Sequence, residues 1–200
     1  MMIKRLFDIV SALLGLIILS PLLLFVALAI VLDSRGGVFY KQVRVGKKNR
    51  DFVLYKFRTM VTGADKIGLL TIGDDDKRVT RVGRFLRSYK LDELPQLINV
   101  LNGSMSIVGP RPEVRKYVAL YDCNQLTVLD LKPGLTDYAS LAYLDENAML
   151  AASPSPEAAY IETIMPAKLE LNIKYMQEQS LLVDLKIILK TIAGILAKNK

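Results

Sequence analysis

The sequence predicts a mostly helical α/β protein that has one small β-hairpin and a membrane-anchored N-terminus. Residues 9–32 carry no charge, and this stretch exceeds the roughly 20 residues that a helix needs to cross a bilayer. Two short segments rich in β-forming residues follow, and much of the remaining chain places apolar residues at helical spacing. We therefore expect a membrane anchor over residues 1–34 and a single folded domain over residues 35–200.

The apolar segment contains the pair Ser20-Pro21 near its midpoint. Proline removes a backbone donor and clashes with the preceding turn, so we expect two half-helices of about a dozen residues each. Basic residues flank the segment on both sides, and positive charge favours the cytoplasmic side of a membrane. A re-entrant hairpin satisfies both flanks, whereas a simple span, the alternative, leaves Lys4 and Arg5 outside. A secretory signal is disfavoured, because the stretch is long and no cleavage site follows.

Residues 38–43 and 52–58 predict the β-hairpin, because both are rich in β-forming residues and a turn-like segment at 46–49 separates them. Residues 61–77 predict a loop. This loop contains Asp74-Asp75-Asp76, which could bind a divalent cation. We favour a solvated loop that leads into a helix, with Asp76 near the positive end of that helix.

A helix is expected from Val79, and arginines recur along it at intervals of three. They are Arg78, Arg81, Arg84 and Arg87. Residues three apart share a helix face, but the row drifts around the helix, so the four cannot all face one ligand. Arg87 lies closest to the acidic pair that follows and is the candidate site residue. The other three fit a basic face on anionic lipid equally well.

Asp92 and Glu93 form an adjacent acidic pair that follows these arginines and precedes Gly109-Pro110-Arg111-Pro112. Arginine forks suit phosphate oxygens, and a carboxylate pair among them can attack phosphorus, hold a metal ion or do both. This pattern indicates phosphate chemistry. The alternative is ordinary capping, because Asp92 opens a predicted helix whose first turn contains Pro95.

Composition narrows the chemistry. The chain has no histidine, which excludes a Ser-His-Asp triad and His-ligated zinc. Cys123 is its single cysteine, so no internal disulfide forms, and we expect a buried or incidental thiol. The net charge of +7 is concentrated in residues 1–58, which attracts anionic lipid headgroups. Nucleic acid is not expected, because the anchor accounts for the charge and no aromatic-interleaved basic motif is present.

The C-terminal region predicts an amphipathic helix over residues 181–196. Its leucines and isoleucines recur at helical spacing, with Asp184, Lys186 and Lys190 offset from them. Such a helix can lie on the membrane surface or pack on the protein core, and both remain open.

Several segments, in order along the chain, resemble the motifs of the bacterial sugar transferases, the monotopic polyprenyl-phosphate phosphoglycosyl transferases. They are Ser20-Pro21, residues 55–60 (YKFRTM), residues 82–87 (VGRFLR), residues 91–113 (LDELPQLINVLNGSMSIVGPRPE) and residues 132–136 (KPGLT). The resemblance runs from about residue 3 to residue 190. Several motifs in the same order make this resemblance to the family highly specific.

The resemblance implies that residues 35–200 form a catalytic domain on the cytoplasmic face of a bacterial inner membrane. This domain would transfer a sugar-1-phosphate from a UDP-sugar to polyprenyl phosphate. In the family an Asp-Glu dyad with Mg²⁺ performs the chemistry, and Asp92-Glu93 match it. Asp92 would attack the β-phosphorus, and Glu93 would orient the metal or the acceptor. Ser20-Pro21 match the break in the family's re-entrant helix.

Arg87, Arg111 and Arg58 are the candidate phosphate-binding residues. Arg111 stands between two prolines that restrict the backbone, which limits the entropy lost on clamping a ligand. A structural turn with an exposed arginine is the alternative for Arg111. A non-catalytic membrane scaffold that binds lipid or phosphate is the alternative for the whole chain, and a homo-oligomer is left open.

The chain departs from the common family pattern at two places. Ser104 replaces an acidic residue in the segment Gly103-Ser104-Met105-Ser106, and Asp137 follows Thr136 where many relatives have glycine. The second change leads to the hypothesis of a subgroup with its own sugar preference.

Overall fold

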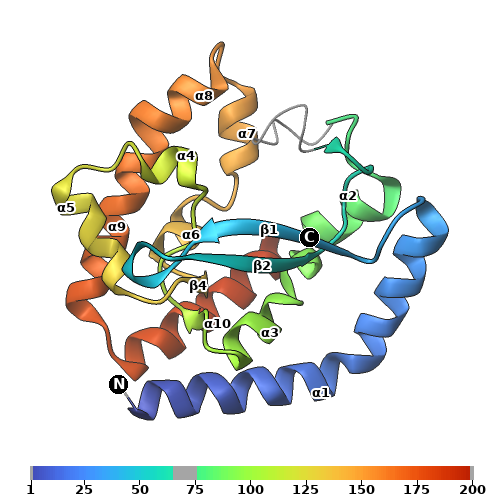
Figure 1. Cartoon of the computed structure of the whole chain (residues 1–200), viewed down its shortest axis with the longest axis horizontal. Coiled ribbons are helices and arrows are strands. Elements are labelled where there is room, and N and C mark those ends of the chain that lie inside the picture. The colour runs from blue at the N-terminus through green and yellow to red at the C-terminus, as the bar shows by residue number, and fades with distance from the viewer. Residues whose placement is uncertain (1, 65–75, 199–200) are drawn as a thin grey trace.

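The computed structural model describes residues 2–64 and 76–198, and their architecture is mostly helical (Figure 1). The helices are α1 (Met2–Asp33), α2 (Arg81–Ser88), α3 (Gln96–Leu101), α4 (Arg115–Val118), α5 (Cys123–Leu126), α6 (Tyr138–Ala142), α7 (Glu146–Ala151), α8 (Pro156–Ala159), α9 (Met165–Glu178) and α10 (Leu181–Lys198). The strands are β1 (Phe39–Val45), β2 (Asp51–Phe57), β3 (Ser106–Val108) and β4 (Gly134–Thr136). Short turns of other helix types are η1 (Lys47–Asn49), η3 (Leu91–Glu93), η4 (Thr127–Asp130) and the π turn η5 (Tyr160–Ile164).

α1 is a single long apolar helix that bends along its course. Figure 1 shows it running along the lower edge of the molecule and then turning up the right-hand side. Ala12, Val26 and Ile30 are buried against the body, whereas most of its large apolar side chains are exposed. Within the described part of the chain, α1 is the one helix long and apolar enough to cross a membrane.

The pair Ser20-Pro21 lies inside α1 and does not divide it, contrary to the expected two half-helices. Pro21 has no amide hydrogen to donate to the carbonyl of Ile17, four residues before it. The Ser20 hydroxyl donates to that same carbonyl at 2.8 Å. Because the carbonyl left over by proline has a partner, the helix continues past Pro21, and the proline is a sufficient cause for the bend.

Both ends of α1 are tied to the body of the protein. Near its start, Lys4 forms an ion pair with the buried Asp184 of α10, and Arg5 donates to the last carbonyls of α3. At its far end, Arg58 donates to the Ser34 hydroxyl at 2.6 Å and the Ser34 carbonyl at 2.9 Å. Cations that bind terminal carbonyls stabilise helix ends, so these contacts hold α1 along the body.

The predicted hairpin is confirmed. β1 pairs antiparallel with β2, from Phe39 opposite Phe57 to Val45 opposite Asp51. Leu54 and Phe57 are buried in two different core clusters, and Leu54 packs with residues of α1 and α3. The hairpin therefore forms one wall of the body, and its second strand carries Lys56 toward the acidic pair.

Close backbone approaches join the sequence motifs in space. A β-carbon on Gly83 would lie 2.1 Å from the Thr59 carbonyl oxygen, so α2 can pack on the end of the hairpin only with glycine there. A β-carbon on Gly109 would likewise lie 2.3 Å from the backbone of Lys132. Gly134 donates to the Pro110 carbonyl at 2.9 Å, which docks residues 132–136 against the Gly109-Pro110-Arg111-Pro112 turn.

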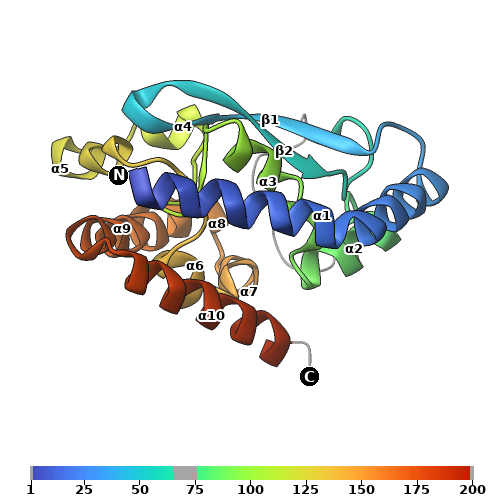
Figure 2. The same cartoon turned by 90° about the horizontal axis from the view of Figure 1, so that it is seen from below.

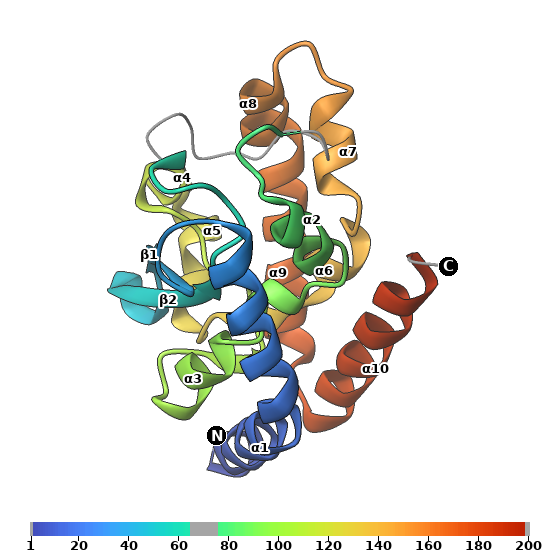
Figure 3. The ribbon, with the colours of Figure 1, turned by 90° about the vertical axis from the view of Figure 1, so that its right-hand side faces the viewer.

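Helices α4 and α6 to α10 form the other side of the body. Figures 2 and 3 both show α1 between the hairpin on one side and α10 on the other. A core cluster centred on Val114, Tyr117, Leu150 and Tyr160 joins α4, α7 and η5, and extends into α9. This cluster lies beside the turn that carries Arg111, so its packing helps to hold that turn in position.

The C-terminal helix α10 places its apolar residues on two surfaces. Ile187 is buried, with Val183 and Ile188 packed around the same cluster. Other large apolar side chains of this helix are exposed, namely Leu182, Leu185, Leu189, Ile192 and Leu196. The helix therefore packs on the core with one face, as the second expectation has it, and leaves an apolar face uncovered.

Candidate active site

The turn between α2 and α3 presents the acidic pair. Lys90 adopts a left-handed backbone with a φ of 56°, which ends α2 and redirects the chain into η3. In this turn Asp92 and Glu93 are both buried residues, with relative exposures of only 7% and 9%. α3 begins at Gln96 rather than at Asp92, so the expectation that Asp92 opens this helix is wrong by one short turn.

Glu93 is held by two cations from distant parts of the chain. Arg111 donates to both of its carboxylate oxygens, through Nη1 at 3.2 Å and through Nη2 in a shorter contact. Lys56 of β2 donates to Oε1 at 3.1 Å. A bidentate arginine fixes both the position and the plane of a carboxylate, so Glu93 has little freedom.

Burial and charge move the pKa values of the two carboxyl groups in opposite directions. Burial opposes ionisation of Glu93, but the Arg111 guanidinium and the Lys56 ammonium outweigh it, and the pKa of Glu93 lies well below its usual range. Burial raises the pKa of Asp92, which Lys56 and Arg87 only partly offset. Burial also lowers the pKa of Lys56. Glu93 is thus a fixed anion, and Asp92 is a more basic carboxylate beside it.

The Asp92 carboxylate forms no hydrogen bond or ion pair with any side chain or backbone group in residues 2–64 and 76–198. A capping aspartate would accept a backbone amide two or three residues later, and neither η3 nor α3 has such a side-chain cap. Capping therefore does not explain Asp92. A buried carboxylate without a protein partner has lone pairs available to a ligand.

Two of the three predicted phosphate-binding arginines lie near the acidic pair. The guanidinium of Arg111 contacts Glu93, and the charge of Arg87 lowers the pKa of Asp92. Arg58 is instead buried at the end of α1, where Nε donates to the Gly37 carbonyl at 2.6 Å. The structure brings Arg87 and Arg111 to the site, whereas the described contacts of Arg58 are with α1 and the segment after it.

Asp137 is a site residue whose role the sequence alone did not indicate. Its side chain is fully buried and accepts the backbone amide of Arg111 at 3.1 Å and that of Ser140 at 2.6 Å. One carboxylate therefore caps α6 and holds the proline-flanked turn in place. Glycine here would leave both amides without this acceptor, so the departure at Asp137 positions Arg111.

Lys56 was present in a recognised motif, but its role as a partner of Glu93 was not predicted. It follows from the alternation of side chains along β2, since Lys56 lies two residues after the buried Leu54 and therefore on the same face of the strand. Ser104, the other departure, has a local role: its hydroxyl donates to Asn102 Oδ1 at 2.8 Å in the turn after α3.

The acidic triplet lies mostly outside the described residues. Asp74 and Asp75 fall there, while Asp76 forms an ion pair with Arg78 at 2.6 Å. The side-chain bond from Arg78 holds the pKa of Asp76 below its usual value. Cys123 is exposed at the start of α5, which fits an incidental thiol and not a buried one.

The comparisons with known proteins all match this chain to sugar transferases. The family model "Bacterial sugar transferase" matches residues 1–198. The chain is 38% identical to the sugar transferase EpsL of Bacillus subtilis, over all of this chain and 90% of that protein. It is 38% identical to a UDP-N-acetylgalactosamine-undecaprenyl-phosphate N-acetylgalactosaminephosphotransferase of Aeromonas hydrophila, over 97% of this chain but only 44% of that protein. It is 37% identical to a UDP-glucose:undecaprenyl-phosphate glucose-1-phosphate transferase of Caulobacter vibrioides, over 98% and 70% of the two chains.

Proposed function

The chain belongs to the bacterial sugar transferase family, and from this we propose that it transfers a sugar-1-phosphate from a UDP-sugar to undecaprenyl phosphate. The products are polyprenyl-diphosphate-sugar and UMP, as in the first membrane step of a bacterial glycoconjugate pathway. The observation that carries the proposal is the dyad: a buried carboxylate that has no partner among the described residues, next to one that arginine and lysine hold.

Asp92 is the proposed nucleophile. A carboxylate needs no base to activate it at neutral pH, which suits a chain without histidine. Its raised pKa makes the carboxylate more basic, and basicity favours attack on phosphorus. Arg111 and Arg87 lie where they can bind the phosphate oxygens and offset the charge that accumulates there.

The proposed reaction has two displacements. In the first, an Asp92 carboxylate oxygen bonds to the β-phosphorus, and the bond from that phosphorus to the bridging oxygen breaks. UMP leaves with the electron pair, and a phosphosugar-aspartyl intermediate remains. In the second, a phosphate oxygen of undecaprenyl phosphate attacks the same phosphorus, the bond to Asp92 breaks, and the carboxylate returns unchanged. Neither step requires a net proton transfer.

Mg²⁺ fits the donor set as an ion shared with the substrate. Among the described residues no group of three or more carboxylate, histidine or cysteine side chains is arranged so that it could hold a metal ion. Mg²⁺ commonly binds to one or two carboxylates and completes its shell with substrate phosphates and water. Asp92 and Glu93 would hold it, and when bound it supplies positive charge to the diphosphate.

The contacts of α1 support a re-entrant anchor. Contacts to the body are formed at both ends of this helix, by Lys4 and Arg5 at its start and by Asp33 near its end. A helix that spans a membrane has its ends on opposite sides, so these contacts favour re-entry over a simple span. Its exposed apolar residues and the uncovered face of α10 provide the surface for lipid. We therefore place the body and both ends of α1 on the cytoplasmic face of the inner membrane, where anionic lipids would meet the basic N-terminal region.

Cysteine labelling tests this topology. In the unmodified protein the exposed Cys123 reports on the body. In a Met2→Cys variant that also carries Cys123→Ser, the new thiol reports on the start of α1. We expect a membrane-impermeant maleimide to label neither thiol in intact cells and both in inside-out vesicles. Labelling of residue 2 in intact cells, with Cys123 still protected, would show a simple span.

Release of UMP tests the function itself. With the protein in nanodiscs, we expect repeated turnovers of UMP release from a UDP-sugar only when both Mg²⁺ and undecaprenyl phosphate are present. The same assay distinguishes the transferase from a non-catalytic scaffold, because a scaffold would bind lipid or phosphate but release no UMP from any donor.

A further inference from the structure

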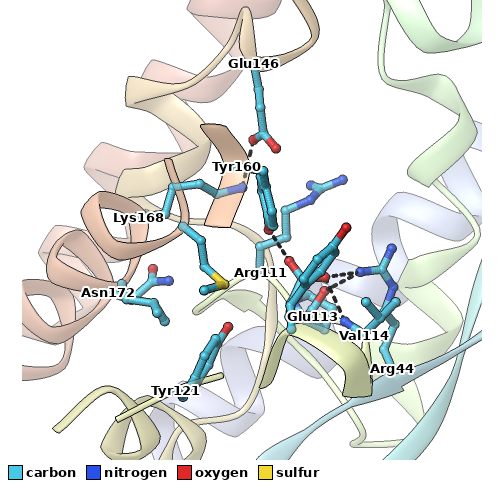
Figure 4. Close-up of a pocket in the computed structure, with 13 residues that line it drawn as sticks. Arg44, Arg111, Glu113, Val114, Tyr121, Glu146, Tyr160, Lys168 and Asn172 are labelled. Carbon is cyan, nitrogen blue, oxygen red and sulfur yellow. Dashed lines mark hydrogen bonds and ion pairs between the residues drawn. The ribbon is translucent and has the colours of Figure 1, made fainter. Parts of the chain in front are cut away.

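A cavity of about 120 Å³ lies directly beside Arg111. Figure 4 shows it between the turn after β3 and the helical segment that runs from η5 into α9. The π turn η5 carries Tyr160 on one wall, and one helical face of α9 contributes Lys168 and Asn172. Pi turns inside helices occur frequently at functional sites, because the extra residue redirects a side chain.

Two polar groups in the cavity wall have no protein partner among the described residues. The Asn172 side chain is only 5% exposed, and its Oδ1 is buried without a hydrogen bond. The hydroxyl of Tyr121 likewise forms no hydrogen bond in this part of the chain. Figure 4 shows both side chains extending toward the cavity. Buried polar groups normally find partners, so the unpaired Asn172 Oδ1 indicates a polar ligand, and the half-buried Tyr121 hydroxyl offers that ligand a second contact.

Four of the five charged groups of the wall are paired with one another, and the fifth, Arg111, is paired with Glu93 outside the wall. Arg44 forms an ion pair with Glu113 at 2.9 Å, and Tyr160 donates to the same carboxylate. Lys168 forms an ion pair with Glu146 at 2.7 Å. Because these charges balance, the cavity suits a neutral ligand that can donate to carboxylates and accept from cations. A sugar ring with several hydroxyl groups has these properties, whereas a phosphate does not.

The size and position of the cavity also suit a sugar. A water molecule occupies about 10–15 Å³ on this measure, so the volume admits about ten water-sized groups, close to the dozen non-hydrogen atoms of a hexose. Three tyrosine side chains line it, at positions 117, 121 and 160, and ligand pockets combine such aromatic surface with a few polar groups. Arg111 connects the cavity to the dyad, since it lines the former and binds Glu93 in the latter.

We propose that this cavity is the subsite for the sugar ring of the nucleoside diphosphate sugar, with Asn172 and Tyr121 binding its hydroxyl groups. The proposal rests on the proposed function, which puts the phosphate that bears the sugar at Asp92. With that phosphate held between the dyad and Arg111, the attached sugar extends along the arginine side chain into the cavity. Asn172 and Tyr121 are then the residues that select among sugars.

The test compares donors on Tyr121→Phe, Asn172→Leu and the unmodified protein. The donors are UDP-glucose, UDP-galactose and their N-acetylhexosamine counterparts, with UMP release as the readout. Each variant loses about one hydrogen bond to the sugar, so we expect kcat/KM for the preferred donor to fall about tenfold. The ratio between preferred and disfavoured donors should shrink as well, because the lost contact is specific to the sugar. Inhibition by UMP, which has no sugar on its phosphate, should stay unchanged.

Tyr143→Phe is the matched control. Tyr143 packs against the same core cluster as Tyr121 but does not line the cavity, so its variant should keep the unmodified ratios. Unchanged ratios in Tyr121→Phe, which removes a single oxygen atom, would overturn the proposal even if Asn172→Leu failed to fold. Weaker UMP inhibition in step with kcat/KM would also overturn it, because the cavity would then bind the nucleotide. If the unmodified protein released no UMP from any donor, the proposed function would fail instead.

Discussion

Asp92→Asn is expected to abolish sugar-phosphate transfer, with kcat reduced by about four orders of magnitude or more. The amide has the same shape as the carboxylate but cannot form the acyl phosphate, and removal of a covalent nucleophile has effects of about this size in other enzymes. When the unmodified protein is incubated with a donor labelled in its β-phosphate and no acceptor, the protein should retain the label. The label should be released by hydroxylamine, which cleaves acyl phosphates. Asp92→Asn should retain none.

The fold should survive this substitution. Burial raises the pKa of Asp92, which means that the folded protein disfavours its charge, so a neutral isostere should be at least as stable. Thermal unfolding of the two proteins measures this directly. Asp122→Asn is the matched control, since Asp122 is an exposed cap of α5 where asparagine serves equally well. Substantial turnover, or labelled protein, in Asp92→Asn would exclude Asp92 as the nucleophile.

Local patterns in the sequence predicted those features that depend on neighbouring residues. The hairpin followed from alternating β-forming residues around a turn, and the apolar helix from its length. The Ser20-Pro21 pair indicated where the regular hydrogen bonding of that helix is interrupted, but it did not divide the helix, which is continuous. Proline predicts a missing hydrogen bond, and only the structure shows that the adjacent serine donates to the carbonyl concerned.

Features that depend on distant residues were not predictable in the same way. Arg58 and Arg111 are both arginines in recognised motifs, and the prolines beside Arg111 restrict its backbone without showing which group either side chain contacts. The fold shows this, because it places Arg58 against the end of α1 and Arg111 against Glu93. The role of Asp137 likewise depends on the docking of β4 beside β3, which brings it to the Arg111 amide from 26 residues away. Contacts of this kind require the three-dimensional fold.

Arg111→Met is expected to lower kcat/KM for the donor by about two to three orders of magnitude. This substitution removes the bidentate donor beside the dyad and leaves Glu93 with Lys56 as its cationic partner. Loss of one preorganised donor to a developing phosphate charge has effects of this size. Arg111→Lys should recover only part of the loss, because an ammonium restores the charge but not the planar fork.

The same substitution should also destabilise the protein, by about 2 kcal/mol. Breaking a fully buried ion pair costs about 3–5 kcal/mol, and the Arg111 side chain is 35% exposed, which reduces that cost. Arg115→Met is the matched control in the next helical segment, where Arg115 pairs with Asp51 and both side chains are about half exposed. It should change stability by less than about 1 kcal/mol and leave transfer unaffected. Denaturant unfolding measures the effect on stability, and initial rates measure the effect on transfer. If Arg111→Met lost stability but retained kcat/KM, Arg111 would only stabilise the fold, and another residue would have to bind the phosphate.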